Sequence, residues 1–306
     1  MGIDTKIEWT QATWNPIRGC TRVSEGCRNC YAEAIAGRFS GPGQAYHRLA
    51  KMTSLGARWT GRVDLIERRL FDPINWKEPR RIFVNPTSDL YHGKLEEEDI
   101  AAVFAVMARA DWHTYQILTK RPGRMLSFLS DIQAREKIAR KIRGLFGVNS
   151  TSAAARVATW PLPRVWQGIS IEDQDTADSR IPFLLLAPAA VRWISAEPLL
   201  GPIDLRAALA LANGSVKIDW LVCGGESGRR ARPMKAEWAR SLRDQCQAAG
   251  IKFFFKQWGE YLPPMTSGSP DVVPQHLNCS DDPVRVGKKN AGRTLDAREW
   301  NEYPAA

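Results

Sequence analysis

The stretches Val165–Ile171, VWQGISI, and Val191–Ala196, VRWISA, lie on either side of a helical segment, Thr176–Leu186. Both flanking runs are short and mostly apolar, which is typical of parallel strands that are covered on both faces. Parallel neighbours need a long crossover connection, which is usually a helix. Residues 165–196 therefore predict a strand–helix–strand unit of an α/β protein.

The same alternation continues on both sides of this unit. The other predicted strands are Arg81–Pro86, Thr114–Thr119, Trp220–Cys223 and Lys252–Lys256, and the other predicted helices are Glu96–Arg109, Asp131–Phe146 and Ala236–Ala249. The G-x-G-x-x-G fingerprint of a dinucleotide-binding sheet does not follow the first strand. We therefore expect a partial or closed (β/α) barrel of six to seven parallel strands.

Two segments interrupt the alternation. Residues 40–61, SGPGQAYHRLAKMTSLGARWTG, are rich in glycine and basic residues, and we interpret them as an inserted loop that closes over a ligand. Residues 263–282 are rich in turn-forming residues. The predicted organisation is a barrel over residues 1–262, which carries the basic insertion, and an irregular C-terminal extension over residues 263–306 that packs on the barrel.

The chain carries a formal net charge of +10, and its basic residues are clustered. Seven lie within residues 38–69, where Tyr46 and Trp59 are interleaved with them. Basic clusters favour polyanions, and aromatic rings among them suit unstacked bases, so nucleic acid is the predicted partner. No apolar run reaches the ~18–20 residues that a membrane helix needs. The N-terminus also lacks a signal-peptide pattern, so we expect a cytoplasmic protein with no membrane partner.

The segment GCTRVSEGCRNCY places Cys20, Cys27 and Cys30 in a C-x6-C-x2-C arrangement. Thiolates are soft ligands that suit iron–sulfur clusters or zinc. Cys27 and Cys30 can chelate one metal centre from a single turn, and the glycines of the loop can return Cys20 to it. A structural zinc site normally has four protein ligands, whereas three cysteines leave one position open. The loop at residues 18–31 is therefore predicted to bind a cluster, with zinc as the alternative.

The other cysteines, Cys223, Cys246 and Cys279, show no such spacing. Unpaired cysteines are often buried as small apolar residues, so we expect structural roles for all three. Cys279 could supply a fourth ligand, but nothing in the spacing requires it.

Polar residues recur directly after the predicted strands. Because the carboxyl ends of the strands in a (β/α) barrel face its active site, we expect these side chains to lie together. We assign Glu197, Lys256 and Lys120 to catalysis, and Asn85, Ser170, Glu172, Gly224, Gly225 and Glu226 to cofactor binding. The two glycines allow a ligand to approach the backbone closely. Each polar residue also has a plainer interpretation as a helix cap or a solvated loop residue.

An ordered set of motifs resembles a phage-associated family of unknown function that is often described as radical-SAM-like. The motifs include IEWTQATWNPIRGCTRVSEGCRNCYAE near the N-terminus, NPTSDL at residues 85–90, ISAEPLLGPIDL at residues 194–205 and GGESGRRARPM at residues 224–234. The resemblance covers nearly the whole chain. It implies a partial barrel with a cluster bound by the three N-terminal cysteines.

The wider resemblance is to radical S-adenosyl-L-methionine (SAM) enzymes. It implies a [4Fe–4S] cluster on three cysteines, SAM as a second cofactor, and reductive cleavage of SAM to a 5′-deoxyadenosyl radical. This chain departs from the usual pattern in three ways. The first cysteine spacing is six residues rather than three, Tyr31 follows the last cysteine instead of preceding it, and the GGE at residues 224–226 lies late in the chain. These departures bear on SAM rather than on the cluster.

The predicted function is that of an iron–sulfur enzyme that generates a radical from SAM to modify or repair nucleic acid or a nucleotide. A reductant protein is a further candidate partner. Two alternatives remain open. One is a cluster-containing DNA-binding or repair protein that does not cleave SAM, and the other is a zinc-stabilised nucleic-acid-binding module.

Overall fold

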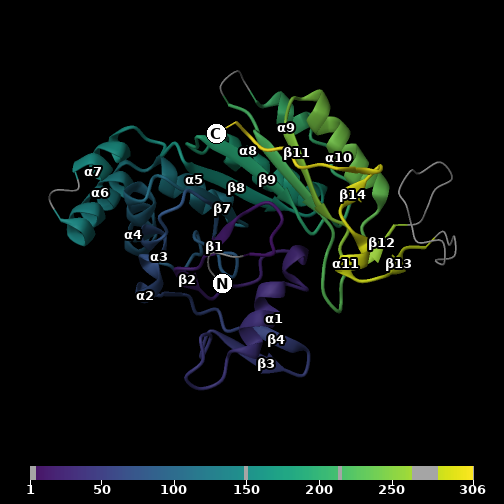
Figure 1. The fold of residues 1–306 in the computed structure, drawn as a ribbon, viewed down its shortest axis with the longest axis horizontal. Helices are drawn as coiled ribbons and strands as arrows, with labels where there is room; N and C mark the ends of the chain where they lie inside the picture. Colours follow the sequence, from purple (N-terminus) through teal and green to yellow (C-terminus); the bar gives the residue numbers. More distant parts are fainter. Residues whose placement is uncertain (1–4, 148–150, 213–215, 264–281, 306) are drawn as a thin grey trace. The chain divides into compact units, whose positions relative to one another are not determined.

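The computed structural model describes residues 5–147, 151–212, 216–263 and 282–305. Seven strands form one sheet in the order β1-β6-β7-β8-β9-β10-β11 (Figure 1). They are β1 (Ala12–Trp14), β6 (Arg81–Val84), β7 (Thr114–Thr119), β8 (Val165–Ile171), β9 (Val191–Ala196), β10 (Trp220–Gly224) and β11 (Lys252–Gln257). The pairings described within this sheet are parallel. β1 and β11 are the two edges of this sheet and do not pair with each other. Of the two predicted alternatives, the structure therefore supports a partial (β/α) barrel rather than a closed one.

The predicted strands and helices are largely confirmed. β7, β8 and β9 have the predicted bounds, and the main helices α4 (Glu97–Arg109), α6 (Ile132–Phe146), α8 (Gln174–Leu186) and α10 (Ala236–Ala248) differ from prediction by at most two residues at either end. β1 was not predicted. In the described part of the chain, no helix is both long and apolar enough to cross a membrane.

The first of two compact units comprises residues up to Val23, Ala32–Ile169 and Leu186–Arg192. In it, β1, β6, β7 and the first part of β8 pair side by side. α4, α6 and α7 (Thr151–Ala158) pack against one another, and α5 (Pro122–Ser130) contacts α6 (Figure 1). α4 is buried from Ile100 to Ala108, so it supplies much of this unit's core.

The basic insertion of the first unit contains a hairpin that was not predicted from the sequence. β3 (Ala50–Thr53) pairs antiparallel with β4 (Gly56–Trp59), and the chain reaches the hairpin from α1 (Tyr31–Arg38). β2 (Ile17–Arg18) pairs antiparallel with β5 (Asp64–Leu65), followed by α2 (Glu67–Leu70) and α3 (Asp72–Asn75). Neither short strand shows an alternation of exposed and buried residues, so no strand pattern marked the hairpin in the sequence.

The second unit comprises Ser24–Tyr31, Ser170–Leu185 and Trp193–Ala306. Its strands β9, β10 and β11 pair in parallel, and α10 contacts β10 and β11. The other elements are α9 (Arg206–Ala210), α11 (Lys288–Ala291), β12 (Tyr261–Leu262) with β13 (Val284–Arg285), and β14 (Thr294–Leu295) with β15 (Arg298–Glu299). The rings of Trp193 and Trp220 lie 5.3 Å apart in the core of this unit.

Residues 300–302 run antiparallel along β11. The amide of Phe255 donates to the carbonyl of Trp300 at 2.9 Å, and the amide of Glu302 donates to the carbonyl of Phe253 at 3.2 Å. Between these bonds, Phe254 forms an antiparallel bridge with Asn301. The tail thus packs on the sheet, whereas residues 264–281, which include Cys279 and most of the predicted irregular segment, lie outside the described residues.

Candidate functional site

Cys27 and Cys30 lie in the second unit on one tight turn. A short 3₁₀ helix, η1 (Glu25–Cys27), opens the turn, and the amide of Cys27 donates to the carbonyl of Ser24 at 3.0 Å. The amide of Cys30 donates to the carbonyl of Cys27 at 3.4 Å. Cys27 is buried and Cys30 is half-buried. We call residues 24–31 the cysteine turn.

The backbone of the cysteine turn rests on the side chain of Glu172. A Cβ atom at Gly26 would lie 2.4 Å from Cγ and 2.5 Å from Oε1 of Glu172, closer than real Cβ atoms come to their neighbours. Glu172 has 0% exposure, and Arg180 Nη1 holds both of its carboxylate oxygens, at 3.3 and 3.2 Å. Glycine is therefore required at position 26 because the Glu172 side chain lies too close for a Cβ atom, and not because the backbone adopts a left-handed conformation.

Replacing Gly26 with Ala should lower the free energy of unfolding by about 1–3 kcal/mol, the usual cost of an extra methyl group in a packed site. The clash cannot be relieved cheaply, because the salt bridge to Arg180 fixes Glu172. Urea denaturation measures the effect. Gly144→Ala in α6 is the matched control: no atom lies within 4 Å of its Cβ position, so that change should stabilise the chain by about 0.5–1 kcal/mol. Equal effects of the two substitutions would contradict the packing argument.

Glu226 ties the cysteine turn to the segment that follows β10. Asn29 Nδ2 donates to Glu226 Oε2 at 3.0 Å, and Arg232 Nη2 donates to Oε1 at 2.7 Å. Arg232 also donates from Nη2 to the carbonyl of Glu25 at 3.0 Å, so it bridges the two segments. Burial alone would raise the pKa of Glu226, but the hydrogen bonds from Arg232 and Asn29 outweigh it and hold that pKa below its usual value. The carboxylate is therefore ionised at neutral pH.

Gly225 is constrained by packing. A Cβ atom there would lie 1.9 Å from the carbonyl oxygen of Trp258, and the amide of Gly225 donates to the carbonyl of Gln257 at 2.9 Å. The segment after β10 thus fits closely against the end of β11. The structure supplies this packing reason for the glycine, and the cofactor contact expected of it stays a prediction.

Glu197 and Lys256 form an ion pair at the ends of β9 and β11. Lys256 Nζ donates to the two carboxylate oxygens at 2.7 and 3.0 Å. Gly224, on the strand between them, has a Cβ position 3.4 Å from both Glu197 Cδ and Lys256 Cβ. The pair therefore lies beside a residue without a side chain, and its two side chains remain 20% and 14% exposed.

Ser170 connects this pair to Glu172. Its hydroxyl lies 3.2 Å from the carbonyl oxygen of Glu197 and 3.4 Å from Glu172 Oε1. The second unit therefore brings together seven of the predicted residues and the cysteine turn: Ser170, Glu172, Glu197, Gly224, Gly225, Glu226 and Lys256. The sequence analysis missed their partners Arg180, Arg232 and Asn29.

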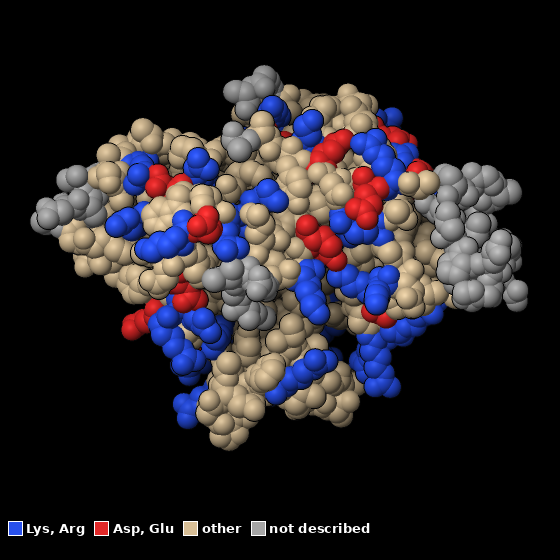
Figure 2. Space-filling model, in the orientation of Figure 1, with Lys and Arg blue, Asp and Glu red and all other residues tan. Residues whose placement is uncertain are grey.

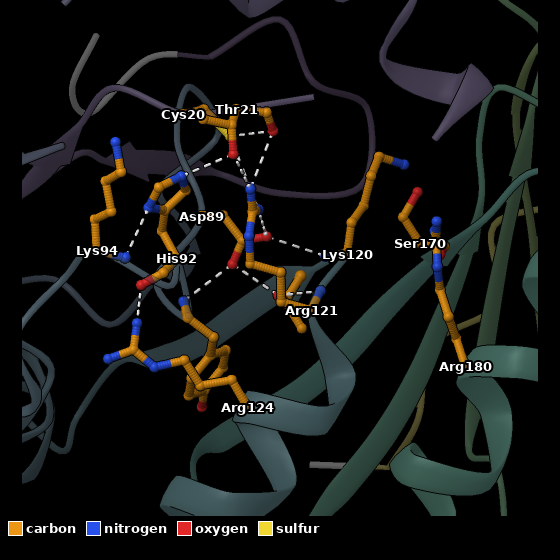
Figure 3. Close-up of polar contacts among 12 residues, drawn as sticks. Cys20, Thr21, Asp89, His92, Lys94, Lys120, Arg121, Arg124, Ser170 and Arg180 are labelled. Atoms are coloured by element: carbon orange, nitrogen blue, oxygen red, sulfur yellow. Dashed lines mark hydrogen bonds and ion pairs between the residues drawn. The ribbon is translucent and has the colours of Figure 1, made fainter. Parts of the chain in front are cut away.

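Cys20 lies in the first unit beside Arg121 (Figure 3). Arg121 Nη1 lies 4.0 Å from the sulfur of Cys20 and donates to Asp89 Oδ2 at 2.7 Å. Its Nη2 donates to the carbonyl and the hydroxyl oxygens of Thr21, at 3.0 and 2.7 Å. Burial opposes the charge on Arg121, but Asp89 and the Cys20 sulfur outweigh burial and raise its pKa. A permanent cation thus lies against the first cysteine.

Two more predicted residues lie near this network. The backbone amide of Lys120 donates to Asp89 Oδ2 at 3.1 Å, and Figure 3 shows its side chain extending from the same strand end as Arg121. Asn85 has a left-handed backbone, φ 57°, and its Oδ1 accepts from the amide of Ile17 at 3.2 Å. Asn85 therefore fixes the backbone at the first residue of β2. Its role in cofactor binding stays a prediction.

His92 contacts Thr21 from the other side. Its Nδ1 accepts from the amide of Lys94 at 3.2 Å, so Nε2 carries the hydrogen and donates to the Thr21 hydroxyl oxygen at 2.9 Å. Burial, reinforced by Arg121, lowers the pKa of His92 to about 4. The imidazole is therefore neutral at neutral pH.

The depressed pKa of His92 predicts a loss of stability on acidification. The unfolded chain binds the proton near pH 6.5 and the folded chain only near pH 4, so this contribution is complete above pH 6.5 and falls as the pH drops toward 4. After allowance for solvent screening, it amounts to about 2 kcal/mol. Burial also lowers the pKa of His113 and adds to the same loss.

Urea denaturation of wild type and His92→Asn between pH 7 and pH 5 isolates the share of His92. The variant should show the shallower pH dependence, because it lacks the titrating ring. Parallel curves for the two proteins would show that His92 does not supply this slope.

In the described part of the chain, no three His, Cys, Asp or Glu side chains are grouped so that they could hold a metal ion. Cys20 belongs to the first unit, and Cys27 and Cys30 belong to the second. That the three cysteines share one centre stays a prediction.

Comparison with known proteins gives one match. The family model described as "Protein of unknown function (DUF5131)" matches residues 4–304. This confirms the expected family of unknown function across nearly the whole chain. No curated protein and no solved structure matches the chain.

Proposed function

We propose that this chain, which belongs to the DUF5131 family, is an iron–sulfur enzyme that uses SAM to modify or repair nucleic acid or a nucleotide. The observation that carries the proposal lies in the second unit. There the cysteine turn rests on Glu172 and is held to Glu226, so the backbone that carries Cys27 and Cys30 lies next to the carboxylates that follow β8 and β10. Carboxyl ends of parallel strands are where α/β enzymes place their active sites.

The donor set fits an iron–sulfur cluster. Three thiols within eleven residues offer soft ligands, and each cysteine of such a cluster binds a different iron atom, so its ligands need not converge on one ion. Cys20, Cys27 and Cys30 would hold the cluster. Arg121 supports this assignment, because a half-buried cation beside Cys20 favours its thiolate. A reduced cluster would supply the electron that turns SAM into a radical source.

Glu197 and Lys256 are the proposed contacts for the amino-acid end of SAM. Their ion pair would open, so that Glu197 accepts from the ligand ammonium group and Lys256 pairs with the ligand carboxylate. Ser170, Gly224 and Gly225 would line the same place. Lys120, at the end of β7, would pair with a phosphate or carboxylate group. Asn85 and the phage association remain predictions from the sequence, as does a reductant partner.

Anaerobic purification with iron and sulfide analysis tests the cluster. We expect about four irons and four sulfides per chain, with visible charge-transfer absorption that Cys27→Ala abolishes. Cys246→Ala is the matched control, because Cys246 is a buried thiol of α10 and should leave the iron content unchanged. Zinc without sulfide, or iron retained in Cys27→Ala, would overturn the assignment.

SAM use is tested separately on protein that carries the cluster. With dithionite, wild type should release 5′-deoxyadenosine, and Lys256→Met should release far less while keeping its iron. No 5′-deoxyadenosine from cluster-loaded wild type, with and without DNA, would remove SAM from the proposal.

A second candidate is a cluster-containing DNA-binding or repair protein that does not cleave SAM. The observation that favours it is that each strand-end glutamate already has a basic partner: Glu172 with Arg180, Glu197 with Lys256 and Glu226 with Arg232. Those carboxylates would then be structural. The iron analysis and the 5′-deoxyadenosine assay together separate the two functions.

A further inference from the structure

The hairpin of β3 and β4 is fastened to the first unit at its base. Ala36, Tyr46, Leu49 and Ala50 form a small buried cluster, against which Trp59 packs. The Cβ position of Gly37 lies 2.4 Å from Ala57 Cβ and 2.9 Å from Met52 Sδ, so α1 and the hairpin are in direct contact. These contacts hold the base of the hairpin against α1.

The hairpin carries positive charge and no negative charge. Residues 38–62 contain five Lys or Arg and no Asp or Glu. Figure 2 shows blue and tan atoms, and no red ones, over the part of the visible face that α1, β3 and β4 occupy in Figure 1. A surface that carries basic and no acidic residues attracts polyanions.

Lys51 and Arg58 lie directly opposite each other in the hairpin register. Like charges at opposed positions destabilise an antiparallel pair, so a nearby anion would stabilise this arrangement. Arg58 lies 3.8 Å from Glu33, but that carboxylate also pairs with Arg22. Among the described acidic residues, none lies within ion-pair distance of Lys51. The repulsion is therefore only partly offset within the chain.

The end of the hairpin exposes apolar side chains next to these charges. Met52 and Leu55 are each 64% exposed, and Phe39, which follows α1, is 50% exposed. Strand alternation places Lys51 and Arg58 on the face opposite Met52, which contacts α1. Basic residues beside apolar ones at the tip of a two-stranded ribbon suit a nucleic acid, whose phosphates and bases lie side by side.

We propose that the hairpin β3–β4 is a nucleic-acid-binding arm, in which Lys51 and Arg58 contact phosphates and Leu55, in the turn between the strands, packs against bases. The proposal rests on the proposed function for the nucleic-acid substrate, and it adds the surface that holds the substrate. It does not depend on the cluster, because all these residues lie outside the cysteine turn.

Fluorescence anisotropy of the full chain with labelled DNA tests the arm. Oligonucleotides in single-stranded and duplex form, and their RNA equivalents, show which nucleic acid supplies the phosphates. Two lost phosphate contacts in Lys51→Gln/Arg58→Gln should reduce the salt slope, log Kd against log salt, by about 1.4 for a single strand or 1.8 for duplex DNA, and weaken binding at least tenfold. Leu55→Ser should weaken binding without changing the salt slope.

Arg140→Gln/Lys141→Gln on α6 is the matched control. It removes the same charge from residues that pair with Glu98, so the salt slope should stay as in wild type. Thermal unfolding verifies that the hairpin variants remain folded. Unchanged slope and affinity in Lys51→Gln/Arg58→Gln would overturn the arm, as would binding to phosphatidylglycerol vesicles without binding to any oligonucleotide.

The same assay separates this inference from the proposed function. DNA binding that is lost in the hairpin variants of a protein without iron would keep the arm and reject the iron–sulfur enzyme. An iron-loaded protein whose hairpin variants bind DNA like wild type would keep the iron–sulfur enzyme and reject the arm.

Discussion

Arg180→Met should lower the free energy of unfolding by about 3–5 kcal/mol, the usual result of removing one partner from a buried ion pair. Glu172 has 0% exposure, and the Arg180 side chain has 9%. Arg180 Nη1 also donates to the carbonyl of Ser170 at 2.6 Å, so the substitution leaves a buried carboxylate and a buried carbonyl without this donor. Urea denaturation with a tryptophan fluorescence signal measures the loss.

The double variant Glu172→Gln/Arg180→Met is the control for this result. It removes both charges, so it should recover most of the stability that the single variant loses. A single variant within about 1 kcal/mol of wild type would contradict the buried ion-pair argument. Because Gly26 rests on Glu172, under the proposed function the single variant should also lower the iron content of the purified protein.

Asp89→Ala should cost about 3 kcal/mol or more, because one small carboxylate satisfies four donors. Oδ1 accepts from the amide of Tyr91 at 3.0 Å and from the hydroxyl of Thr119 at 2.7 Å, while Oδ2 accepts from the amide of Lys120 and from Arg121. Its loss leaves Arg121 as an uncompensated cation that is 14% exposed. Urea denaturation gives the free energy, and hydrogen exchange at Thr21 shows whether the segment after Cys20 loosens.

Two further variants separate the contribution of the Asp89 charge from that of its hydrogen bonds. Asp89→Asn keeps an acceptor but loses the charge, and should lie between wild type and Asp89→Ala. Asp89→Ala/Arg121→Met should regain part of the loss, since it removes the orphaned cation. If hydrogen exchange at Thr21 stays as in wild type while stability falls, the network would be structural and would not position Cys20.

The strands could be predicted where they consist of continuous runs of apolar, β-forming residues. β8 and β9 are mostly buried runs of β-forming residues, and their bounds followed from those residues alone. β1 has only three residues, and its identity depends on pairing with β6, Ala12 opposite Ile82, which no local pattern reveals. α5 begins at Pro122-Gly123, which resembles a turn in sequence although proline is favoured at the first position of a helix.

Some residues of the candidate site could be predicted from the sequence, and others could not. That residues after strands gather at one edge is a rule of topology, so Glu172, Glu197 and Glu226 could be named from the sequence. Their partners depend on packing. Arg180 lies eight residues after Glu172, and Arg232 lies six residues after Glu226; neither spacing is a recognised pairing pattern. Arg121 stood in the sequence as one basic residue after β7, and only the structure places it between Asp89 and Cys20.

The contact of residues 300–302 with β11 has a consequence for how copies of this chain behave toward one another. β11 ends the parallel sheet, and an open sheet edge offers unpaired amides and carbonyls that invite a strand from a second molecule. Here the carbonyl of Trp300 and the amide of Glu302 take up these groups in antiparallel fashion. Residues 300–302 thus cover this edge of β11 and oppose edge-to-edge aggregation there.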